Sequence, residues 1–212
     1  MPDIAPSQER PWLTDFATIF AHMWYRDFPL QRALREKAQR ADWTTHIGIA
    51  VRSTADLMGL FTCFESGVRT DAVLRDTKGV VAALEWEWAA LHSGKVNEFK
   101  KLAQLCGDSN YRCLRFAGLV VYGRKGGTDY STRTEKVLEQ YEKEWTERLP
   151  PLLLVVIYFE GIGKNERLQR RQFQDMEMYE IAGGTKKLLR RQPAFPWDVS
   201  GSRWAKETAG GS

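Results

Sequence analysis

The segment from Val68 to Lys101 reads VRTDAVLRDTKGVVAALEWEWAALHSGKVNEFKK, and the fold prediction starts from it. Successive residues from Val68 to Arg75 are expected to point to opposite sides of the chain, as in a strand. The Asp-Thr-Lys-Gly sequence at 76–79 is typical of a hairpin turn. A second, more apolar strand follows from Val80 to Trp88, and the apolar residues of 97–105 then recur at helical spacing. The segment therefore predicts two strands joined by a tight turn and followed by a helix.

The same reading extends in both directions along the chain. Apolar residues at helical spacing predict further helices at 11–28, 30–40, 44–58 and 132–145. Apolar or alternating runs predict further strands at 60–65, 113–122, 152–159 and 173–181. The run 152–159 is continuously apolar, which is typical of a central strand covered on both faces. This order predicts an α/β fold with a mixed central β-sheet flanked by helices. Residues 1–10 are expected to be disordered, 11–192 to form one domain, and 193–212 to form a flexible tail.

The composition narrows the class of protein. The chain has 212 residues, of which 43% are hydrophobic, enough for one substantial core. Its three cysteines, Cys63, Cys106 and Cys113, are widely spaced, which argues against a disulfide framework or a zinc site and favours a cytoplasmic location. The first twelve residues lack the pattern of a signal peptide. The longest apolar run, 149–159, is too short to span a bilayer, so no membrane association is expected.

Three acidic residues of the opening segment are the strongest candidates for chemistry. Glu85 and Glu87 are two apart in a strand and are expected to share a face. If Asp71 faces them from the neighbouring strand, three carboxylates converge, and a hard divalent cation would relieve their repulsion. Trp86 and Trp88 alternate with the acids and are expected to be buried against a helix while the acids open to a cleft. The alternative is a solvated strand on which Asp71 pairs with a neighbouring arginine and the glutamates form a polar face.

Residues 55–122 resemble the PD-(D/E)XK nuclease superfamily. In that superfamily a hairpin carries an aspartate on its second strand, the next strand carries an acid-x-lysine pair, and a helix and a strand follow. Here Asp71 stands in Arg-Thr-Asp where the family has Pro-Asp, and Glu85-Trp86-Glu87 stands where the family has acid-x-Lys. A lysine relocated to the following helix is a family variation, for which Lys101 or Lys100 is available. The resemblance implies a restriction-endonuclease-like core.

The resemblance also implies an activity, which is metal-assisted hydrolysis of phosphodiester bonds with Mg²⁺ or Mn²⁺ as cofactor. Asp71 and Glu85 would hold the metal, Glu87 would accept a proton from the attacking water or contact a second metal, and Lys101 would stabilise charge on the phosphate. Glu65 or Asp56 is the candidate for an additional upstream acid. Two other readings stay open: a nucleic-acid-binding or regulatory module that keeps this fold without cleaving, and a structural protein with solvent-facing acids.

Basic residues are concentrated in the C-terminal third of the chain. Such a cluster suits phosphate contacts, although it is equally typical of a solvated face. The residues expected to bind nucleic acid are Arg167, Arg170, Arg171, Lys186 and Lys187. DNA is the favoured partner, RNA is the alternative, and a homodimer is compatible with the sequence. Trp197 and Trp204, in the expected tail, are favoured as anchors onto the domain over platforms for stacking bases.

Overall fold

The computed structural model describes residues 11–28, 40–66, 69–108, 111, 114–125, 128–162 and 170–201. In chain order the elements are α1 (Trp12–Arg26), α2 (Arg40–Leu57), β1 (Phe61–Ser66), β2 (Thr70–Asp76), β3 (Gly79–Ala90), η2 (Leu91–Ser93), α3 (Glu98–Cys106), β4 (Phe116–Arg124), α4 (Thr128–Glu144), β5 (Leu152–Ile162), β6 (Arg170–Ala182), β7 (Thr185–Pro193) and η5 (Pro196–Asp198). The expected helix at 30–40 and the expected disorder at 1–10 fall almost entirely outside the described residues. None of the helices in the described part of the chain combines the length and hydrophobicity needed to cross a membrane.

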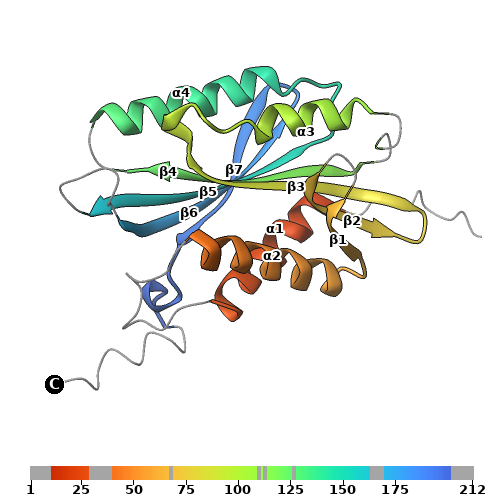
Figure 1. Ribbon diagram of the computed structural model, residues 1–212, viewed down its shortest axis with the longest axis horizontal. Coiled ribbons are helices and arrows are strands. Elements are labelled where there is room, and N and C mark those ends of the chain that lie inside the picture. Colours follow the sequence, from red (N-terminus) through yellow and green to blue (C-terminus); the bar gives the residue numbers. More distant parts are fainter. Residues whose placement is uncertain are drawn as a thin grey trace, which may run out of the picture.

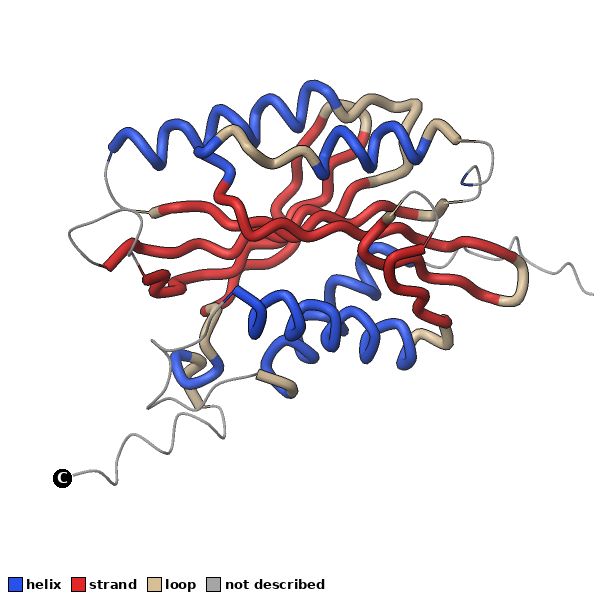
Figure 2. The backbone as a smooth tube through the Cα atoms, viewed as in Figure 1, coloured by secondary structure: helices blue, strands red, loops and turns tan. Residues whose placement is uncertain are grey.

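Within the described residues, seven strands form one sheet in the order of the chain, from β1 to β7. The pairs β1–β2 and β2–β3 are antiparallel, β3–β4 and β4–β5 are parallel, and β5–β6 and β6–β7 are again antiparallel. Helices α3 and α4 cover one face, and α1 and α2 cover the other, so the molecule has three layers (Figures 1 and 2). The expected α/β fold, a mixed central sheet flanked by helices, is confirmed.

The central strands are apolar at nearly every position because both of their faces are covered. In β5, residues such as Leu153 and Val155 belong to the core under α1 and α2, while Leu152 and Leu154 belong to the core under α3 and α4. The alternation in β3 assigns Ala82 and Leu84 to the α1/α2 face and Ala83 to the α3/α4 face. This assignment determines where the polar residues farther along β3 project.

The turn between β2 and β3 is held by its own aspartate. Asp76 Oδ1 accepts hydrogen bonds from the backbone N–H groups of Lys78 and Gly79, at 2.7 and 2.9 Å. This is the local bonding that makes aspartate a good turn residue, and Gly79 takes a φ of 150° that other residues rarely adopt. A tight turn of this kind sets the register of the two strands that carry the candidate acids.

The C-terminal region departs from the prediction at two points. Strand β7 was not expected, because the Lys/Arg-rich sequence 185–193 was interpreted only as a basic cluster; the two-residue Gly183-Gly184 turn, with φ of 56° and 74°, was the available hairpin signal. The prediction of a flexible tail is wrong for residues 193–201. Trp24 Nε1 donates a 2.8 Å hydrogen bond to the Ala194 carbonyl, and Phe195 and Trp197 are buried.

Trp197 therefore anchors the chain, as was favoured. Its ring stacks on Phe195, with ring centroids 4.7 Å apart, and meets the edge of Phe28 at 5.5 Å. Trp204 lies outside the described residues.

His46 on α2 is buried within the same aromatic cluster and provides a test of the packing. Its ring lies 4.5 Å from Trp24 and 5.4 Å from Phe28, centroid to centroid. Burial lowers the pKa of His46 to about 4, because an apolar cage disfavours the charged imidazolium.

We expect this histidine to make the protein less stable as the pH falls. Between about pH 6.5 and pH 4 the unfolded chain binds a proton at this position and the folded chain does not, so the free energy of unfolding decreases by about 3 kcal/mol across this window. Urea unfolding of His46→Phe should lack this part of the decrease, while His22→Ala, at an exposed position of α1, should retain it. Identical pH profiles for wild type and His46→Phe would contradict the burial described here.

Candidate functional site

Asp71 and Glu85 face each other across β2 and β3. The register pairs Ala72 with Leu84, so one further step places Asp71 opposite Glu85. Val73 and Ala83, two residues along each strand, lie in the core under α3 and α4, and side chains two apart share a face. The two carboxylates therefore lie together on the α3/α4 face, as expected from the sequence, and the side chain of Glu85 is only 2% exposed.

Each carboxylate has a protein partner. The backbone N–H of Trp86 donates a 2.8 Å hydrogen bond to Asp71 Oδ2. Lys101, on α3, places its Nζ 2.7 Å from Glu85 Oε1 and donates a hydrogen bond to the carbonyl of Arg69. Glu85 Oε1 is fully buried and receives no well-aligned hydrogen bond from the described residues, so its contact with Lys101 is mainly a contact of charges.

The environment favours a proton on this pair. Burial raises the pKa of Glu85 to about 7; Lys101 lowers this pKa and the Asp71 carboxylate raises it. Burial also raises the pKa of Asp71, against the Trp86 N–H and a hydrogen bond from Glu85, which lower it. The pair therefore keeps a proton to a higher pH than an isolated carboxylate does, and a bound cation would displace that proton.

Glu87 does not join this pair in the way the two-residue spacing suggests. Between Trp86↔Val120 and Ala90↔Tyr122, β3 advances four residues while β4 advances two, so the strand bulges and the simple alternation ends. Glu87 Oε1 accepts a 2.8 Å hydrogen bond from the Ala89 N–H and lies 4.0 Å from Arg40 at the start of α2. Among the residues described, no three His, Cys, Asp or Glu side chains are grouped so that they could hold a metal ion. The expectation of three convergent carboxylates is therefore wrong, and the candidate site is a pair.

The structure also shows which of the candidate lysines and upstream acids lie near the pair. Lys101 contacts the pair, whereas Lys100 lines a groove between α3 and α4 with Phe99 and Tyr141. Asp56 is wrong as an upstream acid because it is on α2, which covers the opposite face of the sheet. Glu65 takes the register position opposite Asp71, but its side chain is exposed and its φ of 50° interrupts the strand.

Glu98 is a member of the site that the sequence analysis left out. Burial raises its pKa, and the charges of Glu87 and Asp71 raise it further, so its carboxyl group lies within the electrostatic reach of both. Glu98 is three residues before Lys101 on α3, and side chains at this spacing share a helix face. Once Lys101 was a candidate, this spacing was the signal for Glu98.

The two tryptophans that alternate with the acids are less buried than expected. Trp86 and Trp88 pack against the α1/α2 core, as their face requires, but both remain partly exposed. Glu85, between them and the hairpin, is almost inaccessible. The predicted face is confirmed, while the predicted contrast between buried tryptophans and acids open to a cleft is wrong.

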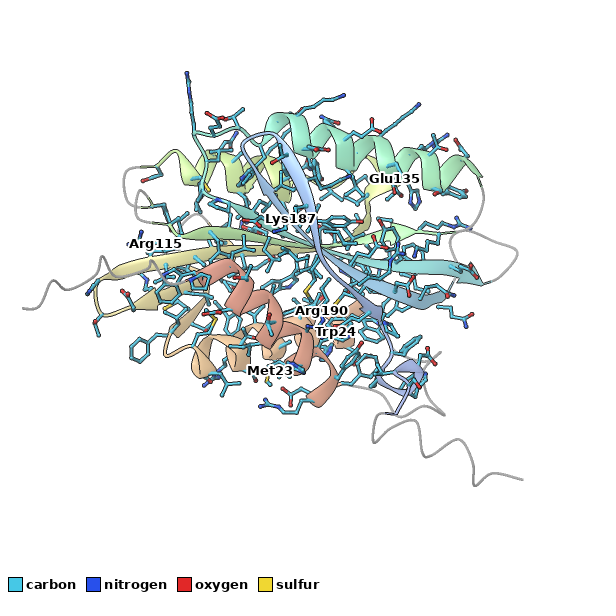
Figure 3. The ribbon with its side chains drawn as sticks, turned by 180° about the vertical axis from the view of Figure 1, so that it is seen from behind. Met23, Trp24, Arg115, Glu135, Lys187 and Arg190 are labelled. Atoms are coloured by element: carbon cyan, nitrogen blue, oxygen red, sulfur yellow. The ribbon has the colours of Figure 1, made fainter. Side chains whose placement is uncertain are left out.

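The basic residues expected to bind nucleic acid do not form one cluster. Arg171 is the second residue of β6, and the register pairs Lys186 with Ile181 near the opposite end of that strand. Ten residues of extended chain correspond to roughly 33 Å. Along β7, Arg190 pairs in register with Met178, and Lys187 lies nearer the β6–β7 turn (Figure 3). Arg191 pairs with the buried Glu177. Arg167 and the side chain of Arg170 lie outside the described part of the chain.

Comparisons with known proteins add little to this geometry. No family model matches the sequence, and no curated protein matches it. A solved structure that is similar is the YaeQ protein from Xanthomonas axonopodis pv. citri, at 10% identity over 63% of this chain and 70% of that chain, with a TM-score of 0.24. A likeness at this level carries no argument about the fold or the activity, so the interpretation of the site depends on its own residues.

The raised pKa of Glu85 predicts how Glu85→Gln changes the stability of the protein. In the window from about pH 4.5 to about pH 7 the folded chain keeps a proton on Glu85 that the unfolded chain has lost, so ionisation destabilises the fold as the pH rises. We expect the free energy of unfolding of wild type to decrease relative to Glu85→Gln across this window, measured in urea with EDTA present. The comparison with the variant is needed because His46 changes the free energy of unfolding with pH in the opposite direction in both proteins. Glu139→Gln, at an exposed position of α4, should follow wild type; if Glu85→Gln does so too, Glu85 is not held protonated by burial.

Proposed function

We propose that the protein is a metal-dependent nuclease of the PD-(D/E)XK type that hydrolyses phosphodiester bonds, with DNA as the favoured substrate. One observation carries the proposal. Two acidic side chains lie opposite each other on the second strand of a hairpin and on the following strand, and the amino group of Lys101, from the helix that comes next, lies 2.7 Å from Glu85. This is the order in which the superfamily presents its acid and lysine residues, and the restriction-endonuclease-like core is proposed on the same ground.

The donor atoms of the pair fit magnesium or manganese. Both ions prefer oxygen ligands, and Mg²⁺ is commonly held by one or two carboxylates together with water and substrate phosphates. Asp71 and Glu85 would supply the two carboxylates, and the buried Glu85 Oε1 has no well-aligned hydrogen bond from the described residues to lose. A bound ion would supply activation of water and neutralisation of phosphate charge.

The other residues have separate roles in the proposal. The side chain of Lys101 is one-third exposed, so its charge is available to a phosphate oxygen and would stabilise charge developing there. Glu87 and Glu98 lie at the border of the pair, where either carboxylate would orient a water molecule or accept its proton. Glu87 takes this role in our proposal because its side chain is 22% exposed and lies on the strand that carries Glu85.

The same contacts also favour a second function, which is nucleic-acid binding without cleavage. Lys101 already places a positive charge beside the pair, and the Trp86 N–H already donates to Asp71, so the pair needs no cation for charge balance. A nucleic-acid-binding module that retained this fold without cleaving would show these contacts.

The two functions differ in a cleavage assay. Supercoiled plasmid and single-stranded DNA are incubated with Mn²⁺, Mg²⁺ or EDTA, and we expect cleavage only with a divalent ion. Asp71→Asn and Glu85→Gln should lower the rate by more than about a hundredfold, since charge neutralisation and water activation are both lost. Lys101→Ala should lower the rate with a smaller effect on metal binding. Glu139→Gln serves as the matched control.

Two results would decide against the nuclease. A Glu85→Gln protein that cleaves as fast as wild type would remove Glu85 from the reaction. A wild-type protein that binds DNA and never cleaves it, with any divalent ion, would establish the binding module in its place.

A further inference from the structure

The bulged end of β3 carries a row of aromatic side chains on the face opposite the acid pair. Trp86 and Trp88 are both partly exposed there. Phe64 of β1, 44% exposed, meets Trp86 edge to face with ring centroids 6.5 Å apart. Gly48 of α2 lies beneath these two rings: a Cβ at this position would be 3.7 Å from Phe64 and 3.9 Å from Trp86. The three aromatic rings therefore remain partly accessible along one strip that borders α2.

Two arginines flank this strip. The guanidinium of Arg171 lies 3.8 Å from the ring centroid of Trp88 and 4.5 Å from that of Phe159. Its Nη1 is buried and has no hydrogen-bond partner among the described residues, and its burial lowers the pKa of Arg171 to about 10. Arg40, at the start of α2, has a side chain that is 69% exposed, and its nearest acid is Glu87 at 4.0 Å. Arg40 is therefore open to an anion from solvent, while Arg171 packs its guanidinium on the rings and adds positive charge beside them.

Strand β3 connects the strip to the candidate acid site on the opposite face of the sheet. The backbone N–H of Trp86 donates to Asp71, so the residue that presents its indole on one face holds the aspartate on the other. Glu87 affects the pKa of Asp71 and that of Arg171, and its charge therefore acts on both faces at the end of the strand. A chain that passes over this end of β3 would meet the rings and arginines on one face and the acid pair on the other.

We propose that Phe64, Trp86 and Trp88, flanked by Arg40 and Arg171, form a track for single-stranded nucleic acid that leads to the acid pair. Exposed rings bind bases by stacking, which requires bases that are not already stacked and paired in a duplex, and arginines bind the phosphates between them. The combination of open rings and cations favours an unpaired strand over a protein or a duplex. The proposal deepens the nuclease function, because it names the class of substrate for the same site.

The test is the affinity for oligonucleotides in EDTA, measured by fluorescence anisotropy with labelled oligo-dT, oligo-U and a mixed-sequence duplex. Binding without metal separates the track from cleavage, so a catalytically inactive protein still tests it. We expect single strands to bind more tightly than the duplex. Phe64→Ala should weaken single-strand binding by roughly five- to hundredfold, the range for loss of one stacked base, with little change for the duplex.

The chain offers matched controls for both kinds of residue. Phe61 is on β1, as Phe64 is; it is 67% exposed and projects to the opposite face of the sheet. Phe61→Ala should therefore leave the affinity unchanged. Arg40→Ala should weaken binding and lower the slope of log affinity against log salt by about 0.7, as expected for one phosphate contact on a single strand. Arg52→Ala, at an exposed position of the same helix, should leave both unchanged.

The outcomes separate this proposal from the nuclease itself. Equal losses for Phe64→Ala and Phe61→Ala, or tighter binding of the duplex with no effect of Phe64→Ala, would overturn the track even if the protein cleaves DNA. Selective loss with Phe64→Ala and Arg40→Ala would establish the track even if no cleavage is found. The oligo-dT and oligo-U arms show whether the bound strand is DNA, RNA or either.

Discussion

The register between β2 and β3 places two carboxyl groups side by side on a covered face of the sheet, and the arrangement around the site follows from the cost of burying them. Two anions at this distance would repel strongly where water is largely excluded. Three features offset this repulsion: a backbone N–H from Trp86, the ammonium group of Lys101, and the raised pKa of Glu85, which favours a proton there. Helix α3 is therefore part of the charge balance of the site as well as a cover for the sheet, and a divalent cation would replace the proton that burial favours on Glu85.

Most of the sheet could be predicted because the signals are local. The aspartate that closes the β2–β3 turn, the alternation in β2 and the continuous apolar run of β5 each follow from contacts within a few residues. The shared face of Asp71 and Glu85 followed from the same alternation together with a tight turn. The contact of Lys101 with the pair could be predicted with one further inference, because a helix directly after β3 brings its first turn back over that strand.

The errors arose where a long-range contact overrides the local pattern. Nothing in Glu85-Trp86-Glu87 indicates that β3 bulges against β4, and this bulge alone takes Glu87 out of the pair. The burial of Glu85, greater than that of the neighbouring tryptophans, depends on α3, whose Lys101 contacts it. The C-terminal segment is retained by a hydrogen bond from Trp24, 170 residues away, to the Ala194 carbonyl, and Lys- and Arg-rich β7 completes a sheet in which its charges are dispersed rather than clustered.

The claim that matters most is that Asp71 and Glu85 together bind a divalent cation. Anomalous scattering from crystals of the protein soaked in Mn²⁺ tests it most directly, with Glu85→Gln crystals as the comparison. The account predicts an anomalous peak within coordination distance of both carboxylates, roughly 2.0–2.6 Å from their oxygens, in wild type and its absence in Glu85→Gln. A wild-type map without a peak at this position, in which Lys101 still contacts Glu85, would contradict it.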